Sequence, residues 1–152
     1  AAGLELPFFE FHEGEAGVAA YPRPAIERNQ AIAALRHLLA LRAGGLRQPL
    51  PFAPYSGWAF FNAEDLRRGV LAARQKWHGD GRAGAWAEGH GEALRLALRG
   101  RDPFADLQAL RAFAATSRAI FSAVTAGAID DGALADFDGL ELPDDDGSEE
   151  AA

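Results

Sequence analysis

Three long stretches of helical periodicity, separated by segments rich in proline and glycine, constrain the fold of this 152-residue chain most. Apolar residues recur every three or four positions over residues 25–43, again after Asn62, and again after Asp102 and Pro103. This spacing gives each stretch one apolar face and predicts three amphipathic helices. Asn62 and Asp102 are favoured N-cap residues, and Pro103 suits the first turn of a helix.

Helix-breaking residues mark where the predicted helices end. Gly44 and Gly45 stop the first helix, and Gly127 stops the last one at about residue 126. The second helix reaches Trp77 and leads into residues 78–91, which hold five glycines and predict a loop. A short helix is expected over residues 92–99.

The amino-terminal segment has a different pattern. Residues 4–12 are rich in phenylalanine and partly alternating, which is typical of a strand, and Pro7 favours a sheet edge. A turn at residues 13–15 and a returning strand over 16–21 would complete a hairpin. We therefore expect a mixed α/β (α+β) domain, with an N-terminal β-hairpin followed mainly by helices.

Charge is distributed unevenly along the chain. The net charge of −7 argues against a nucleic-acid binder, because acidic proteins repel phosphate. However, residues 23–118 carry all 15 basic residues and only eight acids, which gives +7. Residues 1–22 carry −4 and residues 119–152 carry −10, with no basic residue in either segment. The body of the protein is therefore basic between two acidic ends.

Composition excludes several classes of site. The chain has no cysteine, which excludes disulfides and zinc–thiolate centres and suits a reducing, cytoplasmic compartment. No apolar run is long enough to span a membrane. Because the glycine-rich phosphate-binding loops of nucleotide-binding proteins are also absent, we expect no cofactor and no metal.

The clearest positive feature is a run of basic residues between positions 67 and 101. It predicts a surface that binds DNA or an acidic protein partner, although solvated helix faces would show the same composition. The candidate residues are Arg67, Arg68, Arg74, Lys76, Arg82, Arg95, Arg99 and Arg101.

Two His-Gly-acid triplets in the glycine-rich region allow a different hypothesis. His78 with Asp80, and His90 with Glu92, would form a metal-dependent nuclease centre if folding brought them together. Short motifs of this kind arise often by chance, so polar loop residues are the simpler interpretation.

Six short motifs occur in an order and spacing that resembles the C-terminal region of the RecC family, the gamma subunits of bacterial exodeoxyribonuclease V. The resemblance covers roughly residues 18–125. The motifs are 38–41 (Leu-Leu-Ala-Leu), 45–52 (Gly-Leu-Arg-Gln-Pro-Leu-Pro-Phe), 56–59 (Ser-Gly-Trp-Ala), 72–77 (Ala-Ala-Arg-Gln-Lys-Trp), 91–92 (Gly-Glu) and 96–100 (Leu-Ala-Leu-Arg-Gly).

The resemblance implies part of a restriction-endonuclease-like fold, the second half of a nuclease-like domain that has lost catalysis. It also implies a non-catalytic scaffold or interaction domain of a helicase–nuclease that acts in double-strand-break repair and recombination. The implied partners are RecB- and RecD-type helicase subunits, with double-stranded DNA ends or single-stranded DNA reached through the complex.

The residues themselves support the loss of catalysis. Nucleases of that fold hold a metal ion with an acid on one strand and a carboxylate-x-Lys sequence on the next. The corresponding position falls near residues 20–22, where neither a metal ligand nor a lysine is present. The chain has no Asp-x-Lys or Glu-x-Lys sequence at all.

The expected organisation is a RecC-like domain over residues 1–127 and an acidic, disordered tail over residues 128–152. The tail is a candidate to fold back on the arginine surface and screen it. An alternative function from a different class stays open, namely a free-standing helical adaptor that binds an acidic protein partner.

Overall fold

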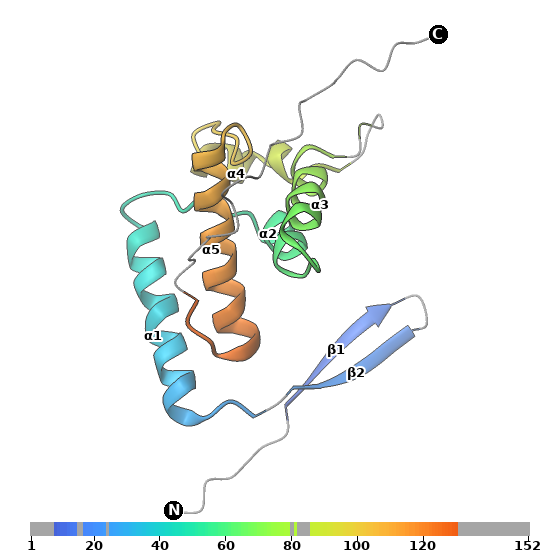
Figure 1. Ribbon diagram of the computed structural model, residues 1–152, viewed down its shortest axis with the longest axis vertical. Coiled ribbons are helices and arrows are strands. Elements are labelled where there is room, and N and C mark those ends of the chain that lie inside the picture. Colours follow the sequence, from blue (N-terminus) through green and yellow to red (C-terminus); the bar gives the residue numbers. More distant parts are fainter. Residues whose placement is uncertain (1–7, 15–16, 24, 80, 82–85, 131–152) are drawn as a thin grey trace, which may run out of the picture.

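The structure is a computed structural model that describes residues 8–14, 17–23, 25–79, 81 and 86–130. A β-hairpin precedes a group of helices (Figure 1). The elements are β1 (Phe8–Gly14), β2 (Gly17–Arg23), α1 (Arg28–Gly45), α2 (Pro54–Phe61), α3 (Leu66–His78), the 3₁₀ helix η1 (Glu88–His90), α4 (Glu92–Ala97) and α5 (Leu107–Ala126).

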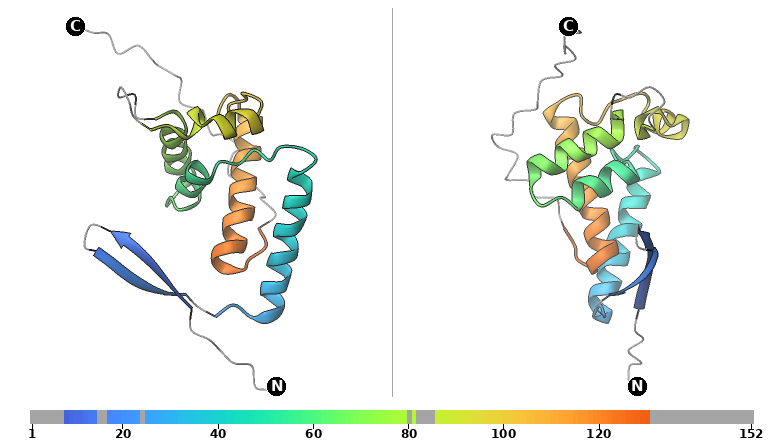
Figure 2. Two further views of the ribbon diagram at one scale, coloured as in Figure 1. Left: turned by 180° about the vertical axis from the view of Figure 1, so that it is seen from behind. Right: turned by 90° about the vertical axis from the view of Figure 1, so that its right-hand side faces the viewer.

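The helical body is organised around α5. The short helix α2 packs against both α3 and α5, and α1 lies alongside α5 (Figures 1 and 2). Aromatic rings join these elements, because Phe113 of α5 contacts both Phe60 of α2 and Phe104 before α5. The core comprises Ala53, Phe60, Val70, Ala73, Trp77, Leu98, Phe104, Leu110, Phe113 and Ala114.

Helix α3 shows how its sequence fixes its orientation. Val70, Ala73 and Trp77 are buried and fall on one face at helical spacing. The opposite face carries basic residues. The carboxylate of Asp65 caps the helix by accepting a hydrogen bond from the Arg68 N–H at 2.8 Å.

Two predicted helix starts are wrong, and both shift toward the C-terminus. Asn62 does not cap α3, because it ends α2, where its N–H bonds to the Trp58 carbonyl. Asp102 does not cap α5, because its side chain closes a turn by accepting the Phe104 N–H. The caps are instead Asp65 and Asp106. The predicted end of α5 is confirmed, since Gly127 is left-handed at φ 61°.

The predicted hairpin is confirmed at the level of the backbone. β1 and β2 pair in an antiparallel register in which Phe11 lies opposite Ala20 and Gly14 lies opposite Gly17. Among the described residues these two strands are the whole sheet. The hairpin extends from the start of α1 as a separate arm (Figure 2).

The predicted α/β fold class is therefore wrong. A restriction-endonuclease-like domain needs a larger sheet flanked by helices, and the described part of the chain has no such sheet. The physical reason lies in the helices, which bury their apolar faces against each other rather than on strands. The composition agrees, because only nine of the 152 residues are Val, Ile or Thr, the β-branched residues that favour strands.

We predict that Gly69→Ala destabilises the protein. A Cβ at this position of α3 would lie 2.9 Å from the Phe60 carbonyl oxygen, which belongs to the backbone of α2. The overpacking should cost about 1–3 kcal/mol of unfolding free energy, measured by urea denaturation. Gly44→Ala in α1 is the matched control, because nothing lies within 4 Å of its Cβ. If both variants unfold at the wild-type midpoint, the α2–α3 contact is not close-packed.

Candidate functional site

Glu88 forms the most deeply buried polar contact between distant parts of the described chain. Its side chain is only 3% exposed and reaches the first turn of α2 from η1. Its Oε1 accepts the Tyr55 N–H at 2.9 Å. Its Oε2 accepts both the N–H and the hydroxyl of Ser56, at 2.7 and 2.6 Å. We call this set of three hydrogen bonds the Glu88 cap.

The start of α2 explains why this cap is needed. The N-cap residue is Ala53, which has no side-chain acceptor, and the first helical residue is Pro54, which has no N–H. The N–H groups of Tyr55 and Ser56 would therefore lack partners in a position where Ser56 is fully buried. A carboxylate is well suited to this place because it also complements the positive end of the helix dipole.

The Glu88 cap positions η1 against α3. The next residue, Gly89, lies so close to Trp77 that a Cβ would be 2.7 Å from the indole Cε2 and 2.9 Å from the Trp77 carbonyl oxygen. Only glycine fits this approach. The following residue, His90, is thereby held beside the C-terminal end of α3.

An open pocket of about 190 Å³ forms at this junction of α3, η1 and the turn after α4. It includes two of the four histidines and two of the candidate basic residues between positions 67 and 101. We call it the His78–Arg101 pocket, and it is lined by Trp77, His78, Gly89, His90, Arg95, Gly100, Arg101 and Asp102.

The acidic residue of the pocket is engaged within the protein. Asp102 Oδ1 accepts the Phe104 N–H at 2.8 Å, and Asp102 Oδ2 lies 3.3 Å from Nε2 of His78. The His78 ring also packs against the Phe104 ring, with centroids 6.1 Å apart. His78 is therefore oriented from two sides.

A left-handed turn shapes the opposite wall. Arg99 has a φ of 54° and Gly100 a φ of 71°, and the Gly100 N–H bonds to the Arg95 carbonyl at 2.8 Å. Left-handed backbone at a non-glycine residue is uncommon. The turn brings Arg101 back toward α4, so that Arg95 and Arg101 share one pocket.

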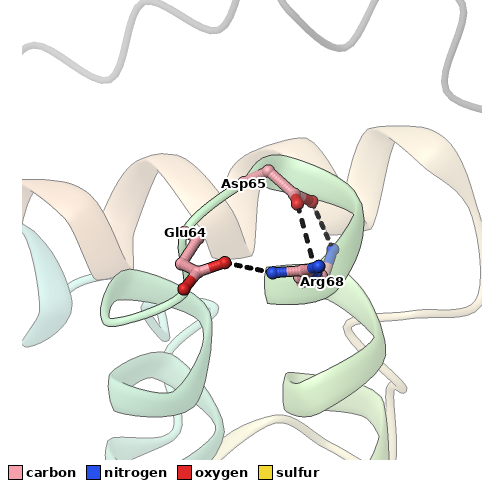
Figure 3. Close-up of polar contacts among 3 residues, drawn as sticks. All are labelled: Glu64, Asp65 and Arg68. Carbon is pink, nitrogen blue, oxygen red and sulfur yellow. Dashed lines mark hydrogen bonds and ion pairs between the residues drawn. The ribbon is translucent and has the colours of Figure 1, made fainter.

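The structure distributes the other predicted basic residues over several surfaces. Arg67 and Lys76 are exposed on α3, Arg74 on the same helix is partly buried, and Arg99 is exposed beside the pocket. Arg68 is engaged locally with Glu64 and Asp65 (Figure 3). Arg82 lies outside the described residues. Their role in binding DNA or a partner stays a prediction.

The four residues of the two His-Gly-acid triplets do not all lie in one place. His78 and His90 line the same pocket, whereas Glu92 is not among its lining residues. Asp80 lies outside the described residues. Within the described part of the chain, no three histidine, aspartate or glutamate side chains gather as a metal site would require.

The structure describes only the first part of the acidic C-terminal segment, up to Asp130. Asp130 pairs with Arg118 of α5 at 3.0 Å, and residues 131–152 lie outside the described residues. The boundary at residue 127 and the screening of the arginines by the tail stay predictions. None of the described helices is long and apolar enough to cross a membrane.

A comparison with protein-family models matches residues 3–65 to the RecC C-terminal domain. Residues 3–65 are therefore similar to the RecC C-terminal domain, and we call them the RecC segment. The match spans the hairpin, α1 and α2 and ends at the cap of α3, so the RecC-like motifs after residue 65 fall outside it. Searches of the curated proteins and of the solved structures find no match.

The similarity to the RecC C-terminal domain covers 63 of the 152 residues. The Glu88 cap joins the RecC segment to the remainder of the chain, because Tyr55 and Ser56 lie inside the matched residues and Glu88 lies outside them.

Sequence reasoning missed Glu88. A single glutamate in a glycine-rich loop carries no motif, and its partners lie more than 30 residues earlier. The sequence does carry a signal at the partner end of this contact. Ala53 and Pro54 begin α2 without a capping side chain, so an acceptor from elsewhere in the chain is needed.

We predict that Glu88→Gln lowers the free energy of unfolding by about 2–4 kcal/mol, because buried donors lose a charged acceptor. Chemical denaturation followed by circular dichroism measures this change. Glu92→Gln is the matched control, since Glu92 is exposed four residues away and should change stability by less than about 0.5 kcal/mol. Equal stability of the two variants would contradict the assignment of the Glu88 cap.

Proposed function

We propose that the chain is a non-catalytic scaffold and interaction part of a RecC-type subunit, which contacts the RecD-type helicase subunit of the complex. The observation that carries the proposal is the RecC C-terminal domain match over residues 3–65. DNA is a second candidate ligand, through the exposed basic residues.

The surface of α1 supports a protein contact. This helix lies inside the matched segment, and Leu35 and Leu39 are 60% and 63% exposed one turn apart. Within the described residues, α1 packs mainly against α5, and Ala34 is its one fully buried side chain. Adjacent exposed leucines on a helix are typical of a surface that another protein covers.

The basic face of α3 supports contact with DNA or with an acidic protein. Arg67, Arg74 and His78 follow one another at intervals of seven and four residues, which places them on one side of the helix. This side borders the buried Val70 and Trp77, so Arg74 is partly buried while Arg67 and His78 are exposed. It leads directly to the His78–Arg101 pocket, since His78 belongs to both.

We predict that the chain co-purifies with a RecD-type helicase subunit and that Leu39→Glu weakens this binding at least about tenfold, because a charge would be buried in an apolar contact. Leu96→Glu is the matched control, since Leu96 is 82% exposed on α4, outside the RecC segment. Absence of binding at micromolar concentrations would overturn the proposal. It would favour the alternative function, a free-standing helical adaptor that binds an acidic protein.

We predict that the chain does not cleave DNA in the presence of Mg²⁺ or Mn²⁺, as a non-catalytic role requires. Gel electrophoresis of linear DNA after incubation with the protein measures this. Cleavage that is lost in His78→Ala would contradict the non-catalytic role and would assign the metal-dependent chemistry to the His78–Arg101 pocket.

A further inference from the structure

We infer that the His78–Arg101 pocket is a binding site for a single phosphate group. This inference rests on the part of the proposed function that names DNA as a second candidate ligand and deepens it by assigning a ligand chemistry to the pocket. Its test needs no helicase subunit, so its failure would leave the proposed protein contact standing. Its basis is the combination of charge, preorganised backbone and size at one place on the surface.

The charges around the pocket favour an anion. Arg95 and Arg101 carry guanidinium groups that present several N–H donors each, whereas the lining has one carboxylate, that of Asp102. Both oxygens of Asp102 already face donors of the protein, the Phe104 N–H and Nε2 of His78. The pocket therefore offers two guanidinium groups and the His90 imidazole to a ligand, whereas both oxygens of Asp102 already have partners within the protein.

The pocket is assembled before any ligand arrives. The Arg95 carbonyl and the Gly100 N–H are bonded at 2.8 Å, and the Arg101 N–H bonds to the Leu98 carbonyl at 3.0 Å, which fixes the wall that carries both arginines. The Glu88 cap and the close approach of Gly89 to Trp77 fix the other wall, which carries His90. Because the backbone of both walls is fixed in this way, binding has to order only the side chains that contact the ligand.

The size of the pocket suits one chemical group of a ligand, and not a whole drug-sized molecule. Its volume of about 190 Å³ is below the roughly 300–1,000 Å³ typical of sites that enclose a drug-sized ligand. A phosphate with the rest of its molecule outside the opening fits such a site. Guanidinium groups also match phosphate oxygens in two-point hydrogen bonds. The phosphate can belong to a nucleic-acid strand or be a free ion.

The test uses the full chain and three probes: inorganic phosphate, an oligonucleotide with a 5′-phosphate, and the same oligonucleotide with a 5′-hydroxyl. Binding is measured by calorimetry and by intrinsic tryptophan fluorescence, to which Trp77 in the pocket lining contributes. We expect Arg95→Gln and Arg101→Gln each to weaken binding of the phosphate probe at least about tenfold, and Arg42→Gln, an exposed arginine on α1, to leave it within about twofold.

The three probes separate the sources of the phosphate. Tighter binding of the 5′-phosphorylated strand than of the 5′-hydroxyl strand supports a site for DNA ends, and equal binding of both strands supports an internal phosphodiester. Binding of inorganic phosphate as tight as that of either strand supports a free-phosphate site. The inference is overturned if no probe binds at millimolar concentration, or if Arg95→Gln and Arg101→Gln, with circular dichroism spectra unchanged, bind like the wild type.

Discussion

The buried carboxylate of Glu88 is the contact on which the arrangement of the site depends. Helix α2 begins with Ala53 and Pro54, so its first N–H groups have no local acceptor, and Glu88 supplies one from 32 residues further along the chain. Because the same residue belongs to η1, satisfying the start of α2 also sets the position of Gly89 against Trp77 and of His90 beside His78. One charged group therefore determines both the packing of a helix and the shape of a pocket.

Part of this structure could be predicted from the sequence, and the successes and failures have a physical pattern. Local signals worked well: the periodicity of α1, α3 and α5, the stop at Gly127 and the hairpin all depend on neighbouring residues. The predicted start of α5 was wrong because two nearby aspartates can accept a backbone N–H. Asp102 closes a turn, and Asp106 caps the helix. The fold class failed because the RecC resemblance implied a sheet, whereas the helices of the described chain bury their faces on each other.

The candidate site could be predicted only in part for a similar reason. Basic composition identified Arg95 and Arg101, and the glycine-rich region identified His78 and His90, but the sequence does not show that these four residues meet. They meet because of a left-handed turn at Arg99 and a tertiary cap from Glu88. The RecC segment ends at residue 65, so the pocket is built from the part of the chain beyond it, and the Glu88 cap is the link between the two.

The Glu88 cap couples the RecC segment to the pocket, and amide hydrogen exchange tests this coupling most directly. In the wild type, the N–H groups of Tyr55 and Ser56 should exchange slowly, because they are buried or bonded to Glu88. In Glu88→Gln, exchange should accelerate both there and at His90 and Gly91, whose N–H groups bond within η1. Unchanged exchange at His90 and Gly91 in a variant that exposes Tyr55 and Ser56 would show that the two regions are not coupled, and would contradict the account.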